Sequence, residues 1–350
     1  MKDESSAIAE PRLPISSPEA NIGSAQGERP AGRPQRTASA GRTRRPVSAG
    51  LVFGFLGVLS FSFTLPFTRV VVGELDPLFV GAGRAVVAAA LSIIVLLVIR
   101  PRLPRGRQWL RLLVVAAGVV AGFPLLTSFA MQSAPAAHGA VVIGVLPAAT
   151  AVVAVLRGGE RPSRAFWLAS IAGLGAVVVF VAVSGGGLTG LHPSDLLLLA
   201  AVVLAAIGYA EGALLARELG SWQIICWALV IGLPVMLPLA LVGASHGPLT
   251  AGPGAWLALA YVSIVSQFIG FFVWYRGLAI GPIATISQVQ LLQPVLTIVW
   301  AALLFGEGLD PVVVIAATVV VVCAGSAVRA RVSKHAPAIV NPVAGENAPA

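Results

Sequence analysis

The chain has 350 residues, of which 57% are hydrophobic and 11% are charged, and its formal net charge at pH 7 is +9. A soluble domain carries about 25% charged residues, so this composition, with a mean hydropathy of +0.91, excludes an ordinary soluble protein. The apolar runs are long and do not alternate with polar residues, so they predict membrane-spanning helices rather than strands.

The first 49 residues form a basic segment that is rich in Pro, Ser, Ala and Gly. Eight of the 23 Lys and Arg residues lie in the first 45 positions. The segment has no apolar periodicity, so we predict a disordered cytoplasmic tail, and a second one at residues 332–350. Because much of the positive charge lies in this tail, the net charge does not point to a nucleic-acid partner.

Ten apolar segments between the tails are each long enough to cross a bilayer, which takes about 20 residues. They are predicted near residues 51–72, 77–99, 109–131, 136–156, 165–184, 194–216, 223–243, 255–278, 283–304 and 311–329. With the N-terminus inside, the inner loops receive nine arginines and the outer loops receive no Lys or Arg. Inner loops of membrane proteins are the Lys- and Arg-rich ones, so both termini are predicted to be cytoplasmic.

An internal repeat relates the two halves of this segment, 50–187 and 188–331. A shift of 147 residues aligns three pairs of identical residues that are hard to match by chance: Pro135 with Pro282, Pro147 with Pro294, and Glu160 with Glu307. Because five helices are an odd number, the second half must cross the membrane in the opposite sense. Such inverted repeats are usual in secondary transporters, with the substrate site near the midplane. A duplicated membrane protein without a transport role is the alternative.

Two runs of residues carry a resemblance to a known family: Gly144–Pro147 through Ser163, and Gln288–Pro294 through Glu307. They resemble the EamA-type domain of the drug/metabolite transporter superfamily, and the resemblance covers residues 51–331. It implies a ten-helix exporter in the cytoplasmic membrane for small polar metabolites such as amino acids. The Trp-Gly pair typical of the family's first helix is replaced by Phe61-Ser62 in this chain.

The predicted ninth helix carries a polar stripe. At about 100° per residue, Gln290, Gln293 and Thr297 lie on one face, whereas Gln288 points away from it. Pro294 removes a backbone hydrogen bond and frees the carbonyl of Gln290. Polar groups in lipid usually face the bundle interior or a cavity, so the stripe is a candidate substrate site. The alternative is that these side chains join neighbouring helices.

Four further side chains are candidates. Gln267 and Tyr209 are predicted to face a cavity, although Tyr is also common at membrane interfaces. Arg84 could bind a substrate carboxylate, but pairing with Glu74 or Asp76 at the outer rim is the favoured prediction. Glu211 is a candidate proton-coupling group, since burial raises carboxyl proton affinity; its alternatives are to reach the interface or to pair with a nearby arginine, Arg217.

Other classes of protein find little support. The four histidines have no metal-ligand spacing, no hydrolase or phosphate-binding motif occurs, and both cysteines fall in predicted spans. We therefore expect a transporter without a cofactor or ATP-binding domain, driven by a gradient, whose partners are a small molecule and membrane lipid. The alternatives are an intramembrane lipid-modifying enzyme and a non-transporting sensor or scaffold. The sequence does not show whether the chain forms a homodimer.

Overall fold

The computed structural model describes residues 45–158, 164–184, 192–280, 286–306 and 311–329, and all regular structure in these ranges is helical. The first-half elements, in chain order, are α1 (Arg45–Ser62), α2 (Thr64–Val72), α3 (Pro77–Ile99), α4 (Arg107–Val115), the π-helix η1 (Ala116–Gly122), α5 (Phe123–Ala130), α6 (Ala136–Ile143), α7 (Leu146–Gly158) and α8 (Arg164–Ser184). The second-half elements are α9 (Pro193–Leu219), α10 (Ser221–Ser245), α11 (Pro253–Ala260), the π-helix η3 (Tyr261–Ile269), α12 (Gly270–Ile280), the 3₁₀ helix η4 (Ser287–Leu291), α14 (Leu292–Phe305) and α15 (Pro311–Arg329).

Seven of the helical segments in the described ranges are long and apolar enough to cross a membrane. They are Ala49–Val72, Pro77–Ile99, Arg107–Ala130, Ala136–Arg157, Pro193–Leu219, Ser221–Ser245 and Pro253–Ile280. They confirm seven of the predicted spans. Two shorter apolar helices, Val289–Phe305 and Pro311–Cys323, and helix α8 fall where three further spans were predicted, so the count of ten stays a prediction.

The outer surface of these helices is apolar. Val98, Leu257 and Leu303 are each more than 70% exposed, and they belong to three different spans or predicted spans. In water such a surface would be unfavourable, because each exposed apolar side chain forfeits about 1.5–3 kcal/mol of burial. Lipid removes this cost, so the exposed surface agrees with the hydropathy of the sequence.

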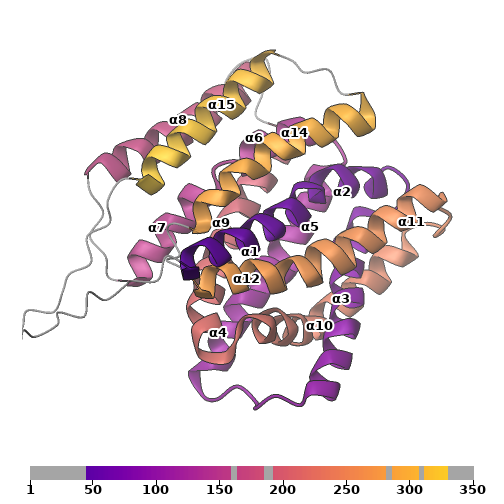
Figure 1. Cartoon of the computed structure of the whole chain (residues 1–350). Coiled ribbons are helices and arrows are strands. Elements are labelled where there is room, and N and C mark those ends of the chain that lie inside the picture. Colours follow the sequence, from indigo (N-terminus) through magenta and orange to yellow (C-terminus); the bar gives the residue numbers. More distant parts are fainter. Residues whose placement is uncertain (1–44, 159–163, 185–191, 281–285, 307–310, 330–350) are drawn as a thin grey trace, which may run out of the picture. The chain divides into compact units, whose positions relative to one another are not determined.

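Helices from the two halves pack in pairs (Figure 1). Helix α1 lies beside α12, α3 beside α10, and α8 beside α15. Helix α9 packs in turn against α4, η1 and α5. Its contact with η1 is very close: a Cβ at Gly118 would collide with the carbonyl oxygen of Leu204 and would lie 3.2 Å from the Cα of Gly208. Only glycine permits backbones to approach so closely.

Several spans are irregular in their middle, and prolines explain much of this. A proline cannot donate a backbone hydrogen bond and frees the carbonyl four residues earlier. The α1–α2 break at Phe63 precedes Pro66, the α6–α7 break precedes Pro147, and η4 precedes Pro294. The π-helix η1 likewise precedes Pro124. Thr64 and Gln293 each lie next to one of these irregular segments, and the second π-helix, η3, carries Ser266 and Gln267.

Candidate functional site

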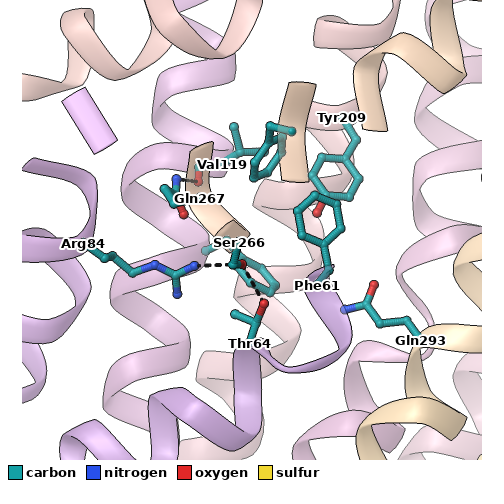
Figure 2. A pocket seen from close by; sticks show the side chains of 10 residues that line it. Phe61, Thr64, Arg84, Val119, Tyr209, Ser266, Gln267 and Gln293 are labelled. Carbon is teal, nitrogen blue, oxygen red and sulfur yellow. Dashed lines mark hydrogen bonds between the residues drawn. The ribbon is translucent and has the colours of Figure 1, made fainter. Parts of the chain in front are cut away.

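A cavity lies among the irregular segments, and both halves of the chain line it (Figure 2). It has about 10 Å³ of free space, roughly what one water molecule needs, so in this conformation the walls are nearly in contact. Its lining residues come from α1, α2, α3, η1, α5, α9, η3, α12 and α14; they are Phe61, Thr64, Arg84, Val119, Phe123, Tyr209, Ser266, Gln267, Phe271 and Gln293.

Arg84 is the charged group of this lining. Its side chain is 1% exposed, and Nη2 donates a 3.3 Å hydrogen bond to Ser266 Oγ, which is 2.7 Å from Thr64 Oγ1. Nε and Nη1 are buried without a hydrogen-bond partner among the described residues. The favoured prediction that Arg84 pairs with Glu74 or Asp76 is therefore wrong.

The two acidic groups of the rim have partners of their own. Asp76 Oδ1 accepts from the backbone N–H groups of Leu78 and Phe79 and so caps α3. Its Oδ2 lies 3.0 Å from His246 Nδ1. Glu74 accepts a 2.5 Å bond from the backbone N–H of Gly252. Both carboxylates bond at helix ends (Asp76 at the start of α3 and the end of α10, and Glu74 at the start of α11), so neither pairs with Arg84.

Aromatic rings form the apolar wall of the cavity. Phe61 and Tyr209 stack with ring centroids 6.5 Å apart, and Phe271 lies 4.9 Å from Phe61 and 5.8 Å from Tyr209. Trp274 packs behind them, 6.2 Å from Phe61. Phe61 and Tyr209 are related by a sequence shift of 148 residues. The chain thus places one ring from each half at the centre, as Figure 2 shows.

A second cavity adjoins the first through Gln293, which lines both. Gln290, Pro294 and Thr297 also line it, together with three apolar side chains of the first half: Leu65, Ala140 and Ile143. The structure therefore brings the predicted stripe to one cavity. Gln288 belongs to η4, but its side chain lies outside what the structure describes.

The stripe residues differ in their hydrogen bonds. Thr297 donates a 2.8 Å bond to the carbonyl of Ser62, which Pro66 leaves without its helical N–H donor. In contrast, both amide atoms of Gln290 and the Oε1 of Gln293 are buried without a partner among the described residues. Buried polar groups of this kind are expected to bond a ligand or water. Thr297 thus joins two helices, while the glutamines offer free groups to the cavity.

Gln267 has a structural bond as well as a place in the lining. Its Nε2 donates a 2.9 Å hydrogen bond to the carbonyl of Val119 in η1. Thr64 and Ser266 were not among the residues singled out from the sequence. The proline two residues after Thr64 and the neighbouring Gln267 were the signals available for them.

Glu211 lies apart from both cavities and forms ion pairs. Its Oε1 accepts from Nε of Arg111 in α4, and its Oε2 lies 2.5 Å from Nη2 of Arg157 at the end of α7. Arg111 also reaches Glu218 at 2.5 Å. Glu211 is 3% exposed, so it pairs rather than extending to the interface. Sequence reasoning missed Arg111 as its partner, because 100 residues separate the two.

The described residues contain no group of three or more His, Cys, Asp or Glu that could hold a metal ion. Cys226 and Cys323 are free. Glu160 and Glu307, whose shared spacing indicated the repeat, lie outside the described ranges.

Comparison with known proteins identifies the family. The model of the EamA-like transporter family matches this sequence twice, at residues 48–182 and 192–327. The chain belongs to the EamA-like transporter family. It is a multi-pass membrane protein and a transporter, not an enzyme, which confirms the resemblance seen in the sequence.

Relatives agree with this assignment. An uncharacterized transporter of Bacillus subtilis, YdeK, is 48% identical over 280 residues, which cover 80% of this chain and 97% of the relative. A probable terminal-alkyne amino-acid exporter of Streptantibioticus cattleyicolor is 26% identical, with coverages of 74% and 86%. A protein crystal structure that is 21% identical superposes with a TM-score of 0.56, covers 80% of this chain and 96% of its own, and shows a shared fold.

Proposed function

We propose that the chain is a secondary transporter that exports small polar metabolites, such as amino acids or related compounds, across the cytoplasmic membrane by alternating access. The observation that carries this proposal is the central cavity. Both halves line it with buried polar groups, and part of its hydrogen-bonding capacity has no partner among the described residues. Secondary transporters bind their substrates at such a junction of irregular helices.

The proposal includes ten helices in two inverted halves, 50–187 and 188–331, with both termini in the cytoplasm. Helix pairing supports this arrangement. If α1 corresponds to α9, and α4–η1–α5 to α11–η3–α12, the contact of α1 with α12 has its counterpart in the contact of α9 with α5. The pairs α3–α10 and α8–α15 each join elements at equivalent positions. A two-fold relation between inverted halves produces this pattern.

Contacts near the two ends of the bundle support alternating access. At the end proposed to be cytoplasmic, Glu211 of α9 holds Arg111 and Arg157 from the first half. At the other end, Asp195 of α9 is 2.7 Å from His138 of α6 and is 2% exposed. The cavity between the two ends has little free space in this conformation. We propose that the contacts at one end and then at the other break in turn, which opens the cavity to one side of the membrane at a time. The coupling role of Glu211 stays a prediction.

An efflux measurement can test two elements of the proposed function: the direction of transport and the polarity of the substrate. Cells that overproduce the chain and cells that lack it are loaded with a complex nutrient mixture, and small molecules in the medium are compared by mass spectrometry. We expect polar metabolites to accumulate in the medium with the transporter present. Identical media would contradict export, and accumulation inside the cells would show the opposite direction.

A further inference from the structure

We infer that the transported molecule carries one carboxylate, which Arg84 binds, and an apolar part that packs against the aromatic wall. This inference rests on the proposed function, because it concerns the same cavity. Its basis is the charge and hydrogen-bond balance of Arg84. Arg111 and Arg157 form ion pairs with Glu211, whereas Arg84 has no acidic partner among the described residues.

Arg84 has no acidic partner among the described residues. Those residues include five Asp and Glu side chains, and each has another partner. Glu74 bonds to Gly252, Asp76 to the α3 N-terminus and His246, Asp195 to His138, Glu211 to Arg111 and Arg157, and Glu218 to Arg111. A buried charge without a counter-charge is strongly unfavourable. A substrate anion would supply the missing charge at this position.

The free donors of Arg84 match a carboxylate. A guanidinium presents its N–H groups as a planar fork that binds both oxygens of a carboxylate. In Arg84, Nε and Nη1 have no partner among the described residues, while Nη2 makes one long bond to Ser266. The hydroxyls of Ser266 and Thr64 lie beside the fork, as Figure 2 shows, and can donate to the same anion.

The rest of the lining restricts the charge of the substrate and offers contacts to its uncharged part. Arg84 is the one Lys or Arg among the ten lining residues, so the lining balances a single negative charge. A phosphate dianion would keep an unpaired charge, whereas a monocarboxylate would not. Phe61, Phe271 and Tyr209 offer apolar area to the body of the molecule, and the free Oε1 of Gln293 can accept from an amino or hydroxyl group.

Arg69 shows the structural role that Arg84 lacks. Its Nη1 donates to the backbone carbonyls of Met131 and Ala134, which join α2 to the segment between α5 and α6. Removing Arg69 should therefore loosen the bundle. Removing Arg84 relieves an uncompensated buried charge, so the empty protein should keep or gain stability while it loses substrate binding.

Binding to the purified full-length chain in nanodiscs tests this inference with a pair of probes, 3-phenylpropanoate and its neutral amide, 3-phenylpropanamide. We expect the carboxylate, and not the amide, to raise the melting temperature of the wild type. Arg84→Leu should abolish this shift, Arg84→Lys should weaken binding at least about tenfold, and Arg69→Leu should lower the melting temperature without a probe. Equal shifts with both probes, no shift with either, or an unchanged shift in Arg84→Leu would overturn the inference.

The same variants in the efflux comparison separate the inference from the proposed function. We expect every compound that the wild type enriches in the medium to carry a carboxylate, and Arg84→Leu to reduce that enrichment at least about tenfold at equal membrane abundance. Exported compounds that lack a carboxylate would overturn the inference and leave export standing. Absence of any exported compound would contradict export, while the nanodisc measurement would still decide the binding of carboxylates.

Discussion

The side-chain amide of Gln267 donates a 2.9 Å hydrogen bond to the backbone carbonyl of Val119, and each residue lies in a π-helical segment. The N–H of Phe123 bonds to the carbonyl of Gly118, five residues earlier. In that register the carbonyl of Val119 would pair with residue 124, which is a proline and has no N–H. Gln267, which lies 148 residues after Val119, supplies the missing donor from the other half.

Replacing Gln267 by Leu should destabilise the protein. The buried carbonyl of Val119 would lose its donor, which costs about 1–3 kcal/mol. The melting temperature of the purified chain should therefore fall by several degrees. Gln132→Leu is the matched control, because Gln132 is exposed between α5 and α6 and should tolerate the change. Equal melting temperatures for Gln267→Leu and the wild type would show that this bond contributes nothing.

Thr297 and Gln290 should respond in opposite ways. Thr297→Val keeps the side-chain shape but removes the bond to the Ser62 carbonyl, so we expect stability to fall by about 1–3 kcal/mol and transport per molecule to persist. Gln290→Leu removes an amide with no partner among the described residues, so abundance should persist and transport should fall several-fold. Melting curves and efflux on the same two variants give the comparison. The reverse pattern would show that Gln290 joins helices.

The ion pairs of Glu211 should keep the bundle closed at the end that is proposed to be cytoplasmic. A cysteine at Ser266, in a chain without Cys226 and Cys323, reports access to the cavity. Glu211→Gln weakens the bonds to Arg111 and Arg157. An impermeant maleimide should therefore label the cysteine at position 266 faster in inside-out vesicles. Asp195→Asn is the counterpart, and it should speed labelling in intact cells instead. Unchanged labelling rates in both variants would contradict the closing role of these contacts.

The proposed topology can be tested with single cysteines in loops. Cysteines that replace Gly190 or Gly247 should react with an impermeant thiol reagent in intact cells, because both positions are predicted to face outside. A cysteine at Arg102 should react only after the membrane is permeabilised. Protection of both outer positions in intact cells would reject the orientation and the inverted repeat together.

Hydropathy was enough to predict most of the spans, because lipid requires long apolar helices whatever their partners are. The stripe of Gln290, Gln293 and Thr297 also followed from helical periodicity, although η4 replaces an α-helical turn at its start. The π-helical segments η1 and η3 have no sequence periodicity from which they could be predicted. The position of η1 depends on Pro124 together with the donor that Gln267 supplies from a distant helix, whereas no proline lies between η3 and residue 282.

The partners of buried charged side chains could not be predicted from the sequence. Arg84 was expected to pair with a nearby acid, yet its described hydrogen bond goes to Ser266, 182 residues away. The Asp76-Pro77 pair at the start of a predicted helix was a usable signal, since an Asp in this position caps the helix. For Glu211, the choice of Arg111 and Arg157 depends on how α4, α7 and α9 pack.

Export measured for Gln293→Leu tests the central claim most directly, because Gln293 lines both cavities. If substrate passes between the two halves at this point, export of the compounds that the wild type releases should fall several-fold at equal membrane abundance, since a lost hydrogen bond costs about 1 kcal/mol or more. Gln132→Leu should export normally. Wild-type export per molecule in Gln293→Leu would contradict the account and place the pathway elsewhere.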